Sequence, residues 1–277
     1  MLDFSRRNEL TLHAEVIADV QATAATLGIE PLIVGAFARD LHLVYAHGIP
    51  VLRQTEDVDL ALAVRDWATF DQLRARLLAS GSFAESNSTH RLLHDGLPVD
   101  LVPFGALEAA DRRIAWPPRG EVVMDVFGFQ EAQQSALAVR LPCDVQASVV
   151  SLPALVLLKL VCWHDRYLRS PKKDASDLQL IMTNYLQAGN DHRLWHEFMP
   201  WTQEDDFDYA AAGARMLGRD VGTLMGAAGR DRTARLLGAQ TEAEVPGPLA
   251  REMNSAEPER PRRLLSAMLQ GLREVTP

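Results

Sequence analysis

The sequence has 277 residues, of which 47% are hydrophobic and 23% charged, as expected for a globular chain of about two domains and unlike a disordered one. Its 37 acidic and 28 basic residues give a formal net charge of −9, which excludes a protein that coats nucleic acid by neutralising phosphates. The only two cysteines, Cys143 and Cys162, exclude a disulfide scaffold and a thiolate zinc finger.

The sequence contains no membrane or export signal. The N-terminus, MLDFSRRNELTLHAEV, mixes charged and apolar residues and lacks the apolar stretch of a secretory signal. The longest apolar run, 152–162, contains Pro153 and Lys159 and is far shorter than the roughly 20 residues that cross a bilayer. We therefore expect a cytoplasmic protein with no membrane contact.

The first hundred or so residues alternate between helical and strand patterns. Asp95-Gly96 is a strong two-residue turn signal and predicts a hairpin of 89–93 with 97–104. This alternation predicts a mixed α/β module. The other predicted elements are, in chain order, a helix in 8–28, a strand at 31–35, a helix at 36–46, a loop at 47–56, a strand at 58–64 and a helix at 66–80.

The rest of the chain changes character near residue 150. Residues 121–141 are strand-like in two stretches, and Ser151-Leu-Pro-Ala then marks a helix start, with Ser151 as N-cap and Pro153 in the first turn. Nearly all of the remainder has a helical pattern. We predict an α/β domain at 1–145 with a small mixed sheet, followed by a mainly helical domain at 146–277.

Three aspartates carry the clearest chemical signal. Asp57 and Asp59 are two residues apart on or beside a predicted strand, so their carboxylates point to the same face. Asp100 lies between apolar neighbours on another strand, where an isolated carboxylate is costly. Each aspartate alone is more simply a cap or a turn residue. If the strands are neighbours, however, three carboxylates converge and require a cation, and oxygen ligands favour Mg²⁺ or Mn²⁺ in phosphoryl or nucleotidyl transfer.

A second signal precedes the aspartates, where a buried strand ends at Gly35-Ala36 and a helix follows. Glycine lets a phosphate approach the backbone, and the N–H groups at a helix start favour anions. Gly35 and Ala36 are therefore candidates for holding a triphosphate. Arg39 is a candidate for contacting phosphate, although an arginine just inside a helix more often pairs with a nearby carboxylate.

The segments VGAFARDLHL and TEDVDLAL, followed by a lone Asp100, resemble the DNA polymerase beta-like nucleotidyltransferase superfamily. In this form, with its Gly-Ala-x-x-Arg-Asp segment, the likeness is to transfer-RNA CCA-adding enzymes and covers about residues 30–105. The resemblance implies a small mixed sheet with flanking helices. It also implies that Asp57 and Asp59 are metal ligands and that Asp100 is the third carboxylate, which assists deprotonation of the attacking hydroxyl.

A second resemblance covers the start of the helical region. SLPALVLLK, then Arg166 seven residues after Lys159, then KDASDL, is similar to the AbiEii-type nucleotidyltransferases, toxins of bacterial abortive-infection and toxin–antitoxin pairs. Where that group has Gly-Ser, this chain has Gly35-Ala36. The resemblance implies nucleotide-binding roles for Lys159, Arg166 and Asp174. In the alternative interpretation, Lys159 extends its amine to solvent and Arg166 pairs with Asp174 or Asp177 as part of the core.

These patterns together predict a metal-dependent nucleotidyltransferase that moves a nucleoside monophosphate from an NTP to an acceptor hydroxyl and releases pyrophosphate. The helical domain would close the nucleotide cleft. The acceptor is left open among a transfer-RNA end, a protein hydroxyl and a small molecule, and an antitoxin protein is a possible partner. The alternative function is a non-catalytic nucleotide-binding or antitoxin-interacting module of the same fold.

Overall fold

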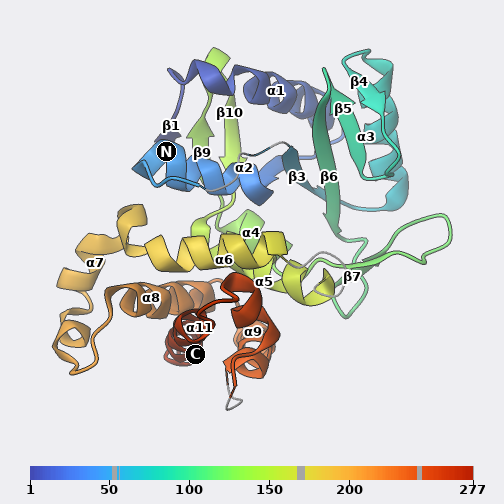
Figure 1. The fold of residues 1–277 in the computed structure, drawn as a ribbon. Coiled ribbons are helices and arrows are strands. Elements are labelled where there is room, and N and C mark those ends of the chain that lie inside the picture. The colour runs from blue at the N-terminus through green and yellow to red at the C-terminus, as the bar shows by residue number, and fades with distance from the viewer. Residues whose placement is uncertain (52–54, 56, 167–171, 242–244, 277) are drawn as a thin grey trace. The chain divides into compact units, whose positions relative to one another are not determined.

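The computed structural model describes residues 1–51, 55, 57–166, 172–241 and 245–276 (Figure 1). The chain divides into two compact units, Met1–Leu41 with Leu52–Ser151 and His42–Val51 with Leu152–Pro277. The first unit holds a mixed sheet with helices and the second is mainly helical, which confirms the predicted mixed α/β fold. The functional division between 1–145 and 146–277 stays a prediction.

An eight-stranded mixed sheet forms the centre of the first unit, in the order β1-β9-β10-β2-β3-β6-β5-β4. Three neighbouring pairs are parallel, namely β1 with β9, β10 with β2 and β3 with β6, and the other pairs are antiparallel. Its strands are β1 (Leu2–Asp3), β2 (Pro31–Val34), β3 (Val58–Val64), β4 (Phe83–Glu85), β5 (Arg91–His94), β6 (Leu97–Gly105), β9 (Leu137–Arg140) and β10 (Gln146–Val149).

Two central strands show why the sheet forms here. All four residues of β2 are buried, so both faces of the sheet are covered at this position. In β3, apolar residues fill the core, and Asp59 is among the few partly exposed positions. The predicted hairpin of β5 and β6 is confirmed, because Asp95 and Gly96 have φ of 49° and 85°, the left-handed values that a tight two-residue turn requires.

The helices of the first unit largely match the sequence pattern. Asp66 caps α3 by accepting a hydrogen bond from the backbone N–H of Thr69 at 2.7 Å, and α1 and α3 pack together. The strand-like region 121–141 also contains a helix, α4, which sequence analysis did not predict. Of the predicted loop, 52–54 and 56 lie outside the described residues. The elements are η1 (Asn8–Leu10), α1 (Thr11–Ala25), α2 (Gly35–Asp40), α3 (Trp67–Ala79), β7 (Arg113–Ala115), β8 (Val123–Asp125), α4 (Phe129–Gln134) and η3 (Pro142–Asp144).

The second unit is a helical assembly in which α11 packs against α8 and α9, and α5 packs against α6. The apolar face of α11 is buried through Leu264, Leu265, Met268, Leu269 and Leu272. None of the described helices is long and apolar enough to cross a membrane. Its elements are α5 (Leu152–Arg166), α6 (Lys172–Asn184), η4 (Leu186–Asn190), α7 (Asp191–His196), η5 (Met199–Gln203), α8 (Tyr209–Thr223), α9 (Ala227–Thr241), α10 (Pro248–Met253) and α11 (Glu259–Arg273); the π-helical turn η2 (Leu41–Tyr45) follows α2.

Candidate active site

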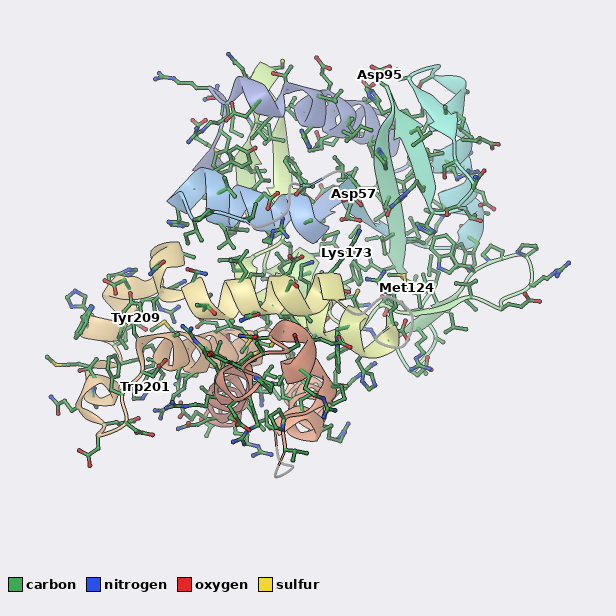
Figure 2. All side chains as sticks on the ribbon, in the orientation of Figure 1. Asp57, Asp95, Met124, Lys173, Trp201 and Tyr209 are labelled. Carbon is green, nitrogen blue, oxygen red and sulfur yellow. The ribbon has the colours of Figure 1, made fainter. Side chains whose placement is uncertain are left out.

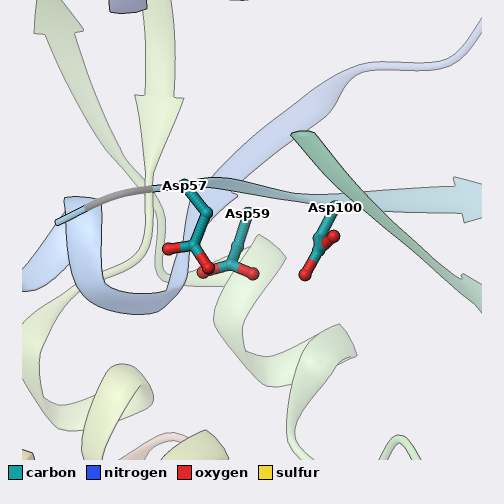
Figure 3. Close-up of side chains that lie close together, drawn as sticks. All are labelled: Asp57, Asp59 and Asp100. Carbon is teal, nitrogen blue, oxygen red and sulfur yellow. The ribbon is translucent and has the colours of Figure 1, made fainter. Parts of the chain in front are cut away.

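The three predicted aspartates come together in the first unit. Strands β3 and β6 run parallel with Asp59 beside Asp100, and Asp57 lies just before β3 on the same face as Asp59. Each contributes a carboxylate oxygen to a group in which these atoms lie within 4.8 Å of one another. The carboxylates turn to the same side of the strands (Figure 3). This is the convergence that the sequence pattern predicts, although the role of each residue stays a prediction.

Gly35 lies directly against this group. The β2–β3 register places Val34 beside Asp59, and α2 begins at Gly35 with a φ of +69°. A Cβ on Gly35 would lie 2.8 Å from Cβ of Asp59 and would overlap with the Asp59 carboxylate. Ala36 follows as the second residue of α2 and is buried. Glycine is thus needed both for the backbone conformation and for the close approach of Asp59.

Arg91 completes the group from the neighbouring strand β5, where it lies opposite Asp100 in the β5–β6 register. Its Nε and Nη2 donate to the two carboxylate oxygens of Asp100 at 2.6 and 2.7 Å, and Nη2 lies 3.7 Å from Oδ2 of Asp57. Hydrogen bonding to Asp100, together with the charges of Asp100, Asp57 and Asp59, raises the pKa of the Arg91 guanidinium against the effect of its partial burial. This pairing is not among the features predicted from the sequence.

Arg39 and Asp40 form a buried pair on α2. Arg39 is 1% exposed, and its Nε and Nη2 donate to Oδ1 of Asp40 at 2.8 and 2.6 Å. The hydroxyl of Thr55 donates to the other oxygen of Asp40, which ties α2 to the segment just before Asp57. This geometry is that of an arginine paired with a nearby carboxylate, and the phosphate contact proposed for Arg39 stays a prediction.

The candidate residues of the helical region form their own buried cluster in the second unit. Nζ of Lys159 lies 2.6 Å from Oδ2 of Asp177 and 3.6 Å from Oδ1 of Asp174. Nη2 of Arg166 lies 3.1 Å from Oδ2 of Asp174. Lys159, Asp174 and Asp177 are buried, whereas the Arg166 side chain is 53% exposed. Asp174 therefore links the buried lysine to an arginine that reaches the surface of this unit.

Comparison with known proteins gives a family match over most of the chain. The family described as "Nucleotidyl transferase AbiEii toxin, Type IV TA system" matches residues 33–276. No curated protein sequence matches the chain.

Three similar solved structures are nucleotidyltransferases or nucleotidyltransferase-like proteins. ANT(2″)-Ia in complex with adenylyl-2″-tobramycin has 16% identity and a TM-score of 0.38, over 66% of this chain and 99% of that one. The antibiotic-resistance factor ANT(2″)-Ia in solution has 17% identity and a TM-score of 0.39, over 69% and 92%. An antigenic nucleotidyltransferase-like protein from Paracoccidioides brasiliensis has 18% identity and a TM-score of 0.39, over 69% and 89%.

Proposed function

The chain belongs to the AbiEii nucleotidyl transferase toxin family, and we propose that it moves a nucleoside monophosphate from an NTP to an acceptor hydroxyl with the help of a divalent metal ion. The observation that supports this proposal is the group of Asp57, Asp59 and Asp100, whose oxygens lie within 4.8 Å of one another. A protein that merely bound a nucleotide or a partner would have no need of three mutually repelling acids, so the group favours catalysis over the non-catalytic alternative.

The donor set fits Mg²⁺ or Mn²⁺, because hard divalent ions prefer carboxylate oxygens and accept substrate phosphates as further ligands. Asp57, Asp59 and Asp100 would hold the ion. When bound, the ion would neutralise phosphate charge and polarise the reacting phosphorus. The backbone at Gly35 and Ala36, at the start of α2, would hold the triphosphate beside these carboxylates.

In the proposed reaction, the acceptor hydroxyl oxygen forms a bond to the α-phosphorus of the NTP. The bond between that phosphorus and the oxygen bridging to the β-phosphate breaks, and pyrophosphate leaves with the electron pair. Asp100 accepts the proton of the hydroxyl. Each carboxylate oxygen has two lone pairs, so Asp100 keeps acceptor capacity although Arg91 donates to both of its oxygens.

We assign nucleotide-binding roles in the second unit to Lys159, Arg166 and Asp174. Arg166 is the exposed cation of this cluster and so is suited to contact phosphate. Lys159 is held by Asp177 and Asp174, and Asp174 in turn contacts Arg166. Lys159 and Asp174 would therefore act by holding Arg166 in position.

The family description supports a toxin role, because it names a toxin of a type IV toxin–antitoxin system. On this proposal the biological partner is an antitoxin, and the acceptor is a transfer-RNA end, a protein hydroxyl or a small molecule. The net charge of −9 disfavours a long RNA acceptor bound mainly through its backbone.

The direct test is release of pyrophosphate from each of the four NTPs with Mg²⁺, with bulk transfer RNA, a protein extract or an aminoglycoside as acceptor. We expect release with at least one acceptor, attachment of labelled nucleoside monophosphate to it, and loss of both with Asp59→Asn. Transfer that continues unchanged in Asp59→Asn would contradict the proposal.

A further inference from the structure

Arg91 places a positive charge inside the group of carboxylates that is proposed to hold a metal ion. It takes both oxygens of Asp100 at 2.6 and 2.7 Å and lies 3.7 Å from Asp57. The Asp100 side chain is 13% exposed and the Arg91 side chain 36%, so solvent screens the charge of Arg91 only in part. Together the three carboxylates and one guanidinium leave a formal charge of −2.

This charge balance acts in opposite directions on two possible ligands. A bare divalent ion entering the group gains the attraction of three carboxylates but meets the repulsion of Arg91. A divalent ion on a triphosphate arrives in a complex that is negative overall, and Arg91 attracts such a complex. One bare divalent ion already neutralises the charge of −2, so any further ion must bring anionic oxygens with it.

We propose that Arg91 makes this site discriminate against a free divalent ion and favour an ion delivered on an anionic triphosphate. The proposal rests on the metal-dependent function proposed above. It assigns to Arg91 a specificity role that the family match does not supply. The competing interpretation is that the bidentate guanidinium only orients Asp100, in which case Arg91 would favour both ligands alike.

The two interpretations predict opposite changes in the affinity for Mn²⁺ when Arg91 is replaced, and one calorimetric experiment on the full chain measures this change. The two probes are Mn²⁺ alone and Mg²⁺ with inorganic tripolyphosphate, which carries the three phosphates common to all NTPs. For Arg91→Gln we expect Mn²⁺ alone to bind about tenfold more tightly, and magnesium tripolyphosphate about tenfold more weakly, than in the unmodified protein. Weaker binding of both probes, or no change in either, would overturn the proposal.

Two further variants separate charge from geometry. Arg91→Lys keeps the charge but loses the bidentate contact, so both affinities should stay within about threefold of the unmodified protein. A loss of both affinities in Arg91→Lys would favour the orienting role and overturn the proposal. Arg119→Gln removes an arginine whose side chain is 80% exposed and paired only weakly with Glu121, and it should change neither affinity.

Removing Arg91 leaves the partly buried carboxylate of Asp100 without its partner, and the variant could unfold for that reason. The same comparison then uses Asp100→Asn against Asp100→Asn with Arg91→Gln, in which no unpaired carboxylate remains at position 100. The double variant should bind Mn²⁺ more tightly than the single one, and weaker binding would overturn the proposal. Asp59→Asn tests the site itself: if it binds Mn²⁺ normally, the proposed function fails, whatever Arg91 does.

Discussion

The carboxylate of Asp59 lies so close to the backbone of Gly35 that no side chain fits between them. A Cβ at position 35 would lie 2.8 Å from Cβ of Asp59 and would overlap with the carboxylate, and Gly35 has a φ of +69°. For Gly35→Ala we expect transfer to fall by at least about 100-fold, because displacing a reacting group by about 1 Å costs that much. Single-turnover transfer measures this loss.

Gly28→Ala is the matched control for this prediction. Gly28 has nearly the same φ, +68°, but a Cβ there would meet nothing within 4 Å. Both variants should lose about 1–2 kcal/mol of stability from the left-handed backbone. Gly35→Ala should lose more because of its overlap with Asp59, and only Gly35→Ala should lose activity. Equal rates of transfer in the two variants would show that the close contact between Asp59 and Gly35 is not required for activity.

Asp100→Asn separates chemistry from binding. The variant keeps the shape of the side chain but loses its charge, so we expect NTP affinity within a small factor of normal and transfer reduced by about 10²–10⁴-fold. Calorimetry and single-turnover transfer measure the two quantities. Asp95→Asn is the control, because Asp95 lies at the far turn of the same hairpin, away from Asp57 (Figure 2), and asparagine suits that turn. Near-normal turnover in Asp100→Asn would show that Asp100 is an ordinary strand residue with no role in the transfer step.

Much of this site was predictable from local sequence patterns. The strand 58–64 and the Asp95-Gly96 turn follow from alternation and turn chemistry, and the structure confirms both. The pairing of Arg91 with Asp100 was also within reach, because a two-residue turn fixes the register of the strands on either side. Counting back from the turn places Arg91 opposite Asp100.

Other features depend on contacts that local patterns do not contain. Asp59 lies beside Asp100 because β3 and β6 pair in parallel. These strands are separated in the sequence by α3 and a hairpin, so their register depends on the packing of the whole sheet. The helix α4 is an exception, because its sequence FQEAQQ contains Glu, Ala and Gln, which favour a helix, so local propensity could have predicted it. The resemblance to the AbiEii-type pattern assigned Lys159 and Arg166 to one site, but it did not show that Asp177 holds the lysine at 2.6 Å.

The buried contacts of Lys159 predict a large cost for removing its charge. Lys159→Met leaves the buried carboxylates of Asp174 and Asp177 without their shared cation, and we expect a loss of about 3–5 kcal/mol in the free energy of unfolding. Urea denaturation measures it. Lys173→Met, at an exposed position of α6, should change stability by less than about 0.5 kcal/mol. Equal, small effects would mean that the cluster does not stabilise the second unit.

His13 predicts a dependence of stability on pH. Its ring stacks on Phe37 at 4.4 Å, and its Nδ1 has no hydrogen-bond partner among the described residues. Burial lowers the pKa of His13 below its usual 6.5, against the opposing charge of Asp40. The unfolded chain therefore binds the proton more readily, and the stabilisation is lost as the pH falls below about 6.5.

We expect His13→Phe to reduce this loss of stability between about pH 7 and 5, as measured by urea denaturation. The exposed-site variant His192→Phe should keep the pH dependence of the unmodified protein. An equal slope of the unfolding free energy against pH in all three proteins would show that His13 does not cause this dependence.

We propose that Asp57, Asp59 and Asp100 bind a divalent ion in the folded protein, and thermal unfolding with and without Mg²⁺ or Mn²⁺ measures that binding. An ion that binds only the folded state adds about 2.7 kcal/mol at 100 times its dissociation constant, so the melting temperature should rise with ion concentration. Asp59→Asn should abolish the rise while leaving the metal-free protein folded, and Asp71→Asn, at an exposed position of α3, should preserve it. A rise that persists in Asp59→Asn, or that is absent from the unmodified protein, would show that these three aspartates do not form the ion site.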